Sequence, residues 1–560
     1  MSEAGPPEPE VWQGRPVPVL LVVVGAMLAA VLFAGAGDRL RLPWPVLLLV
    51  LGAAAAFVPG IEAPDIEPDL ILPLFLPPLL YATAQRTSWA LFRLRWRTIA
   101  FLAVGLVVVT VGAVAGTLVA LTGIGLAAAL AIGAAVAPPD PVAVEAVAGP
   151  LRVPRRLMAT LQSEGLFNDA TALVIFQTAV AAAVAGDDLG ALGVALGFLY
   201  GAVLAVAIGL GAAWLAGRVL DRLTDVVASN GLTLVLPFAV YLAADALHAS
   251  GVIAVVVAAL QLRQHSDADA SEARLTGAAF WNVVEMLVTG VAFALIGLEL
   301  RTVIAQADRS LGTILAHAGI VCGVVVGVRL VWMGLALVSI RGGRPTPAAR
   351  AVPATAGEAL VLGWAGMRGL ATLALALALP TSLDTGAPFP DRAELVIVAC
   401  SVLVVTLVGP GLTLPVLVRV LGLREDADAA VEAERRMATR ARRAALDELA
   451  TVDREALGVD DEQGEQVLDE LRTRFARMGA AFSGDAVPRP EEVDGDRDDD
   501  YRERLARLKR RREQWTRLQA VALAAARREV VAARGEPGTD PEVADRVLRR
   551  LDVRSLARGL

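Results

Sequence analysis

Three polar side chains lie inside one long apolar stretch, and side chains of these types could hold a cation or a proton. Glu164, Asn168 and Asp169 fall between flanks that predict a single hydrophobic helix over residues 155–185. An ionisable side chain is costly to keep inside a bilayer, so residues of this kind commonly mark an ion or proton pathway. The first indication of function is therefore the movement of ions across a membrane.

The spacing of these residues gives the helix two polar aspects. Glu164 and Asn168 are four residues apart and share one face, whereas Asp169 lies about 100° further round. One aspect could hold a structural pair, and the other could face a cavity. A buried carboxylate needs a partner or a proton, which makes Asp169 the candidate ion site. For Asn168 a hydrogen bond between helices, without a role in transport, stays open.

A second polar feature interrupts the preceding apolar stretch at Ala-Pro-Pro-Asp-Pro, residues 137–141. Three prolines remove backbone donors and leave carbonyl oxygens that need partners inside a membrane. One interpretation is a packed kink in which Asp140 caps the following helical segment. We favour a discontinuous helix at a substrate site, where unwound carbonyls and half-helix ends face the ion.

Two arginines in later apolar stretches are the predicted counterparts of these acids. A buried Arg329 needs a carboxylate, and Glu164 is the natural one. Arg368 stands in a Gly-interrupted stretch at residues 363–369, seven apolar spans after the break at Asp140. This spacing indicates an inverted repeat with two discontinuous crossing helices. In such a crossing, Asp140 would offset the positive helix ends and Arg368 the negative ones.

The composition of the chain is that of a polytopic membrane protein. It has 560 residues, of which 56% are hydrophobic, and a mean hydropathy of +0.59. About 20 apolar residues are needed to cross the hydrocarbon core as a helix. We predict an all-α fold with about thirteen transmembrane helices, over residues 17–34, 43–58, 69–84, 98–121, 124–147, 155–185, 190–217, 230–247, 250–263, 279–300, 311–340, 357–380 and 393–421.

Arginines gather in alternate loops between these spans, whereas the other loops carry few arginines and several acidic runs. The positive-inside rule makes the arginine-rich loops cytoplasmic. We therefore predict an extracytoplasmic segment over residues 1–16, a transmembrane domain over residues 17–422 and a cytoplasmic, charged helical tail over residues 423–560. The net charge of −7 averages these unlike regions, and we expect no nucleic-acid partner.

The motifs together resemble those of bacterial sodium/proton exchangers of the monovalent cation–proton antiporter-1 family. The chain departs from the usual family pattern at Pro139, where threonine is usual, and at Gly165, where serine is frequent. The resemblance covers about residues 20–425 and rests on residues 139–144, on Glu164, Asn168 and Asp169, and on residues 250–254, 295–298 and 366–370.

This resemblance implies a site and an assembly. Asp169 would be the site shared by the cation and the proton, with Asn168 beside it as a second cation ligand. Asp140 and the backbone carbonyl of Pro139 would complete the site, and Glu164 would pair with Arg329 to hold the core. The family also implies a homodimer, with a dimerisation domain and a mobile core that carries the fourth to sixth and eleventh to thirteenth spans. No cofactor is expected beside the transported Na⁺ and H⁺.

We therefore predict a transporter of the plasma membrane rather than an enzyme. It would exchange Na⁺, and also Li⁺, for H⁺ by alternating access at Asp169, in an electroneutral cycle. A K⁺/H⁺ antiporter on the same fold is the first alternative. An intramembrane enzyme would need a second convergent acid or a nucleophile–base pair, and a channel would not need exclusive competition at one carboxylate.

Overall fold

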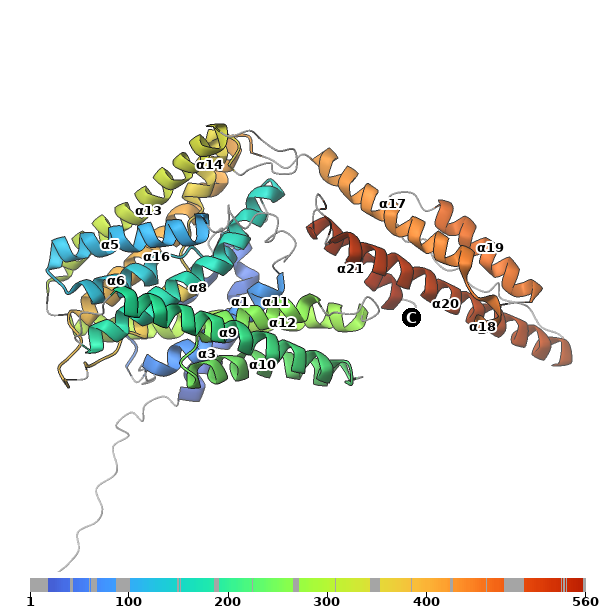
Figure 1. The fold of residues 1–560 in the computed structure, drawn as a ribbon, viewed down its shortest axis with the longest axis horizontal. Coiled ribbons are helices and arrows are strands. Elements are labelled where there is room, and N and C mark those ends of the chain that lie inside the picture. The colour runs from blue at the N-terminus through green and yellow to red at the C-terminus, as the bar shows by residue number, and fades with distance from the viewer. Residues whose placement is uncertain are drawn as a thin grey trace, which may run out of the picture.

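The computed structural model is built of helices, and the part of the chain that it describes contains no strand (Figure 1). The described residues are 19–40, 44–59, 61, 68–86, 101–148, 151, 153–185, 191–223, 225–264, 271–307, 309–342, 353–383, 385–423, 427–459, 461–477, 498–534, 536, 539 and 541–556. The predicted N-terminal segment, residues 1–16, lies outside them.

The apolar stretches of the sequence coincide with helices. By length and composition alone, five helices among the described residues are long and apolar enough to cross a membrane, and seven more apolar helices are shorter. The protein is a multi-pass membrane protein, and the number of its crossings stays a prediction. The helices of this region are α1 (Val19–Leu40), α2 (Trp44–Ala55), α3 (Pro68–Arg86), the π-helical turn η1 (Phe101–Gly105), α5 (Leu106–Thr122), α6 (Leu126–Val136), α7 (Pro141–Ala148), α8 (Arg155–Ala185), α9 (Ala191–Leu220), α10 (Val226–Ala246), α11 (Gly251–Gln264), α12 (Ser271–Ala305), α13 (Leu311–Gly342), α14 (Ala356–Trp364), α15 (Leu370–Leu377) and α16 (Arg392–Val420).

Two of the predicted spans are broken in the middle, at the places where the sequence has prolines or glycines. The span 124–147 consists of α6 and α7, separated by residues 137–140. Prolines at positions 138, 139 and 141 cannot donate backbone hydrogen bonds, so the helix stops before them. The span 357–380 consists of α14 and α15, and two glycines lie in the gap between them.

The helices pack as two groups. α1–α3 and α9–α12 pack mainly against one another, and we call them the scaffold group. η1, α5–α8 and α13–α16 also pack mainly among themselves, and we call them the core group. The two groups meet where α15 and α16 lie against α2, α3 and α12. In Figure 1, α5, α6 and α13 lie above α9, α10 and α12.

Glycines let α2 and α12 approach closely inside the scaffold group. A Cβ atom added at Gly52 would lie 2.2 Å from the carbonyl oxygen of Ala294, and one added at Gly297 would lie 2.3 Å from that of Leu49. Close backbone approach through small residues is a common way to fasten helices in lipid, where water does not drive apolar surfaces together. The scaffold group is therefore tightly interlocked at this contact.

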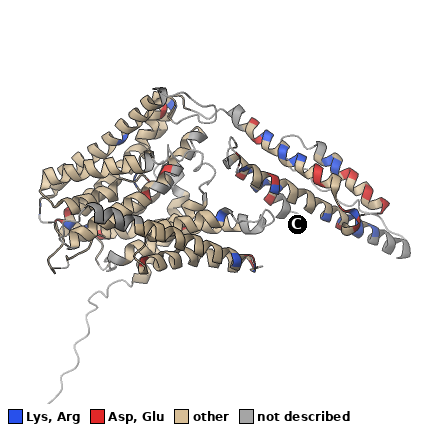
Figure 2. Ribbon diagram, viewed as in Figure 1, with Lys and Arg blue, Asp and Glu red and all other residues tan. Residues whose placement is uncertain are grey.

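The C-terminal tail folds as a separate helical bundle with its own hydrophobic core. Figure 2 shows charged residues throughout this bundle and mostly uncharged residues on the transmembrane helices. Arg440 lies 2.6 Å from both Glu529 and Glu536, and these contacts raise the pKa of Arg440 and lower that of Glu536. We call α17–α21 the tail bundle: α17 (Ala427–Thr451), α18 (Arg454–Leu457), α19 (Glu462–Arg477), α20 (Asp498–Arg534) and α21 (Pro541–Leu556).

Candidate cation and proton site

A cavity of about 70 Å³ lies between the core group and the scaffold group, at the level of the two helix breaks. It is large enough for a few water molecules or a partly hydrated cation. Leucines, prolines and a phenylalanine make up most of its lining, and no three His, Cys, Asp or Glu side chains of the described chain gather as a metal site. Its polar lining comes from both groups, with Asp140 and Asp169 on the core side and Thr83 and Thr289 on the scaffold side.

Asp169 lines this cavity from α8 and is half-buried. Its neighbour Asn168 is fully buried, and neither atom of its amide group has a hydrogen-bond partner among the described residues. A buried amide without partners is costly, so this side chain is the kind of group that a bound cation or water would satisfy. The structure therefore places an unsatisfied amide next in the chain to the acid that lines the cavity, although Asn168 itself is not part of the lining.

Asp140 lies at the crossing of the two broken helices. Its backbone N–H donates to the carbonyl oxygen of Met367 at 2.6 Å, and its carboxylate accepts from the N–H of Ala143 at 3.5 Å. The carboxylate thus sits at the N-terminal end of α7, where partial positive charge gathers. A Cβ atom at Gly369 would overlap this carboxylate, so only glycine leaves room for it.

Arg368 lies on the other side of the break between α6 and α7, at the C-terminal end of α6. Its guanidinium is buried and donates to the carbonyl oxygens of Val136 at 2.9 Å and Ala137 at 3.2 Å, and also to that of Gly366. The carbonyls of Val136 and Ala137 end α6, where a helix carries partial negative charge. The crossing thus has an acid at a positive helix end and an arginine at a negative one.

A buried ion pair ties together three elements of the core group. Arg329 of α13 donates to both carboxylate oxygens of Glu164 in α8, at 2.6 and 3.0 Å, and each side chain is 1% exposed. Arg329 also donates to the carbonyl oxygen of Leu362 in α14 at 3.1 Å. A bidentate, fully hydrogen-bonded pair is the geometry in which a buried charge pair is tolerated.

The glycine that follows Glu164 has a packing reason. A Cβ atom at Gly165 would lie 2.5 Å from the ring of Pro141 at the start of α7. A larger residue would push α8 away from the break in the neighbouring helix. Glycine at this position therefore lets α8 pack closely against the start of α7.

Comparison with known proteins identifies the family. The profile described as sodium/hydrogen exchanger, transmembrane, matches residues 23–420. The chain belongs to this family. An uncharacterised Na⁺/H⁺ exchanger of Mycobacterium tuberculosis is 35% identical over 441 residues, which are 77% of this chain and 80% of the relative. A sodium, potassium, lithium and rubidium/H⁺ antiporter of Bacillus pumilus is 31% identical over 67% of this chain and 58% of its own length.

The fold is also that of a solved antiporter. The sodium proton antiporter MjNhaP1 from Methanocaldococcus jannaschii at pH 8 matches 72% of this chain and 99% of its own, with a TM-score of 0.56 and 18% identity. The exchanger described here is accordingly a secondary active cation/proton antiporter and not an enzyme.

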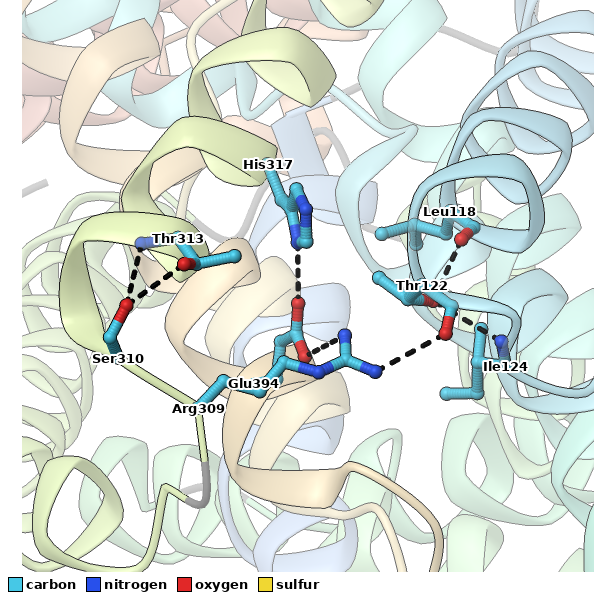
Figure 3. Close-up of polar contacts among 8 residues, drawn as sticks. All are labelled: Leu118, Thr122, Ile124, Arg309, Ser310, Thr313, His317 and Glu394. Atoms are coloured by element: carbon cyan, nitrogen blue, oxygen red, sulfur yellow. Dashed lines mark hydrogen bonds and ion pairs between the residues drawn. The ribbon is translucent and has the colours of Figure 1, made fainter.

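The exchanger has a second polar cluster, away from the cavity, which sequence reasoning missed (Figure 3). Glu394, at the start of α16, is 4% exposed and accepts from Arg309 at 2.7 Å, while its other oxygen lies 2.8 Å from Nδ1 of His317. Arg309 also donates to the carbonyl oxygen of Thr122, at the end of α5, at 3.2 Å. The cluster fastens α5, α13 and α16 at one end of the core group.

Thr289 of α12 was also missed, because a single threonine in an apolar helix gives no signal by itself. The partners of Glu394 are 77 and 85 residues away in sequence, so no local pattern joins them. A buried glutamate in the first turn of an apolar helix was the one available clue.

Proposed function

We propose that this exchanger moves one Na⁺, and also Li⁺, against one H⁺, and that Asp169 is the group that binds either of them. The observation that carries the proposal is the place of this carboxylate, in a small cavity at the boundary of the two helix groups. An anionic Asp169 attracts a cation, and a protonated one does not. Cation and proton then exclude each other at a single site.

Asn168, Asp140 and Pro139 are the proposed neighbours of the bound ion. The unpartnered amide of Asn168 offers an oxygen to a dehydrated cation. Pro139 lines the cavity in the break after α6, and its carbonyl can serve as a ligand because a proline lacks only the N–H. Asp140 and Arg368 counter the helix ends at the crossing, which keeps the broken backbone stable beside the ion.

We propose that transport occurs by movement of the core group against the scaffold group. Asp169 belongs to the core group, whereas Thr83 and Thr289 face it from the scaffold group, so a relative movement would expose the site to each side in turn. Glu164 and Arg329 hold the core group together as it moves. The proposed setting is the plasma membrane, with a homodimer, an extracytoplasmic N-terminus and a cytoplasmic tail.

The test compares purified Asp169→Asn with the wild type in proteoliposomes, with a pH dye reporting cation-driven proton flux. The amide can neither release a proton nor balance a cation, so flux should fall to the level of empty liposomes. Asp245→Asn, an exposed position at the end of α10, is the matched control and should keep wild-type flux. Substantial flux through Asp169→Asn would overturn the assignment.

A second candidate is exchange of K⁺ for H⁺ at the same site. The scaffold side of the cavity offers Thr83 and Thr289 and no carboxylate. The electrostatic field at the site is therefore weak, and a weak field favours K⁺, which gives up its hydration water more easily than Na⁺. The Bacillus pumilus relative is an antiporter of potassium as well as sodium, lithium and rubidium. The same dye assay, run with Na⁺, Li⁺ and K⁺ at equal concentration, separates the two.

A further inference from the structure

The tail bundle touches the transmembrane region at two places that belong to different helix groups. Its first helix, α17, follows α16 of the core group in the chain. Its last helix, α21, packs against α12 of the scaffold group. Figure 1 shows the bundle to one side of the transmembrane helices, with α21 beside the end of α12. One body therefore spans the two groups whose relative movement was proposed above.

The attachment to the core group is covalent and short. α16 ends at Val420, Leu423 is the last described residue after it, and α17 begins at Ala427. Each residue of an extended chain spans at most about 3.6 Å, so the start of α17 stays within roughly 14 Å of Leu423. A movement of α16 must therefore carry or pull on α17.

The attachment to the scaffold group includes an ion pair beside the packing of α21 on α12. Arg263, in the last turn of α11, lies 3.1 Å from a carboxylate oxygen of Asp545 in α21. The other carboxylate oxygen of Asp545 lies 3.2 Å from Arg534 at the end of α20. One acid of the tail bundle is thus shared between an arginine of the scaffold group and one of its own.

The tail bundle can transmit force between these two points because its helices are joined to each other. α17, α19, α20 and α21 share one hydrophobic core. Arg550 of α21 lies 2.6 Å from Glu434 of α17. A continuous connection therefore joins the two groups. It runs from α16 of the core group into α17, then through the Glu434–Arg550 pair to α21. From α21 it reaches α11 of the scaffold group through the Asp545–Arg263 pair.

We infer that the tail bundle is an intramolecular strap, which holds the core group against the scaffold group and slows the exchange cycle through the Arg263–Asp545 contact. The inference rests on the proposed movement of the core group. A contact that exists in one state and must open or shift in the next favours the first state. When a conformational step limits turnover, weakening that contact speeds the cycle.

The variants that test the strap are Arg263→Gln, Asp545→Asn and the pair together. Burial raises the pKa of Asp545, with Arg534 and Arg549 acting in the opposite direction. A raised carboxyl pKa means that the charge costs the folded state stability as the pH rises above the unfolded value near 3.8. The neutral Asp545→Asn variant therefore leaves the tail bundle folded while it removes the acid that Arg263 contacts.

We expect each single variant of the full-length protein in proteoliposomes to turn over about two- to fivefold faster, as fits the loss of one partly exposed ion pair. The cation KM should stay unchanged, because the cavity is not touched. The double variant should be no faster than either single one, since both remove the same contact. Glu434→Gln, which loosens α21 from α17, should act in the same direction.

Glu465→Gln is the control, because it removes an ion pair of similar length, Arg454–Glu465 at 2.7 Å, that is more exposed and lies wholly inside the tail bundle. Its turnover should equal that of the wild type. Unchanged or slower turnover in both Arg263→Gln and Asp545→Asn would overturn the strap, as would equal acceleration by the control. If the variants had a lower melting temperature but did not turn over faster, the contact would be purely structural.

A distance measurement that needs no transport separates failure of the strap from failure of the proposed exchange. Spin labels go on Ala278→Cys of α12 and Val553→Cys of α21, both exposed, after the two buried native cysteines are replaced by alanine. We expect one narrow distance distribution, which Arg263→Gln broadens. A broad distribution in the unmodified pair would overturn the docking itself, whether or not the protein exchanges ions.

Discussion

At the scale of single residues, the buried charges of the core group are arranged as partners. Glu164 holds Arg329 at two points, whereas no hydrogen bond or ion pair joins Asp169 to another described residue. A paired charge serves stability, and an unpaired one beside a cavity is available to a ligand. We therefore propose opposite roles for the two acids of α8, which are five residues apart: a structural one for Glu164 and ion binding for Asp169.

Removing one partner of the Glu164–Arg329 pair should strand a buried charge. We expect Glu164→Gln and Arg329→Gln each to cost about 3–5 kcal/mol, and the double variant to lose much less than the sum of the two. Thermal unfolding in detergent, followed by loss of the monodisperse peak, measures all three. Strict additivity would mean that the two side chains are not coupled.

Competition between cation and proton at Asp169 should appear as a pH-dependent affinity. As the pH falls, a larger share of the sites is protonated, so the apparent KM for the cation should rise while the maximal rate at saturating cation changes less. Initial rates at several cation concentrations between about pH 6 and about pH 8.5 measure this. A constant KM across that range would argue against one shared site.

The chemistry of single residues was the most predictable part of the site. A guanidinium inside an apolar helix requires a carboxylate, and that rule alone led from Arg329 to Glu164. The Glu394 cluster followed from no such rule, because Arg309 and His317 read as loop or helix-end residues that water could solvate. Only the packing of α5, α13 and α16 brings them together.

At the scale of elements, the crossing depends on how closely the two broken helices approach. The backbone of Asp140 donates to the carbonyl oxygen of Met367, and its carboxylate fills the space beside Gly369. Broken helices are stable in a membrane only where their free backbone groups find partners within the protein. Each break therefore supplies hydrogen-bond partners to free backbone groups of the other.

Gly369→Ala should disturb this crossing out of proportion to its size. The added methyl group overlaps the Asp140 carboxylate, and overpacking of this kind costs about 1–3 kcal/mol. We expect a lower melting temperature and a loss of most exchange. Gly319→Ala in α13, where nothing lies within 4 Å of the added atom, should behave like the wild type. Equal behaviour of the two variants would contradict the tight crossing.

The helices themselves were predictable because lipid leaves the backbone few alternatives. The breaks at residues 137–141 and 363–369 followed from proline and glycine chemistry. The π-helical turn Phe101–Gly105 did not, since its sequence is as apolar as the helix that follows. A change of backbone pitch inside an apolar run leaves no mark in composition.

At the scale of the whole molecule, charge balance decides how the membrane potential acts on the proposed cycle. Asp169 with Na⁺ and Asp169 with H⁺ carry the same net charge, so we predict electroneutral exchange. Rates in proteoliposomes should be equal at zero potential and at about 100 mV set by a K⁺–valinomycin gradient. A several-fold difference, or a current that scales with turnover, would indicate a second proton or cation.

The sequence predicted the charged helical tail but not its docking. The charge and helical composition of the tail predicted solvated helices, whereas the structure packs them around a hydrophobic core of their own. The contact between Arg263 and Asp545 joins positions 282 residues apart on two surfaces that are each rich in charge. Many other pairings would satisfy the same charges, so only the structure selects this one.

The pairing of fixed charges inside the core group also bears on how faithfully the two ion fluxes are coupled. Glu164 is paired with Arg329, and Asp140 and Arg368 lie at oppositely charged helix ends of the same crossing, so in the proposed cycle Asp169 is the group that the cargo neutralises. An empty, ionised Asp169 would have to enter the closed cavity with one uncompensated negative charge, at a cost of several kcal/mol. Every kcal/mol of that cost suppresses empty return steps about fivefold. In the proposed cycle the protein would therefore resist slippage, the futile dissipation of the ion gradient, through the scarcity of unpaired charges in its core group rather than through a separate gate.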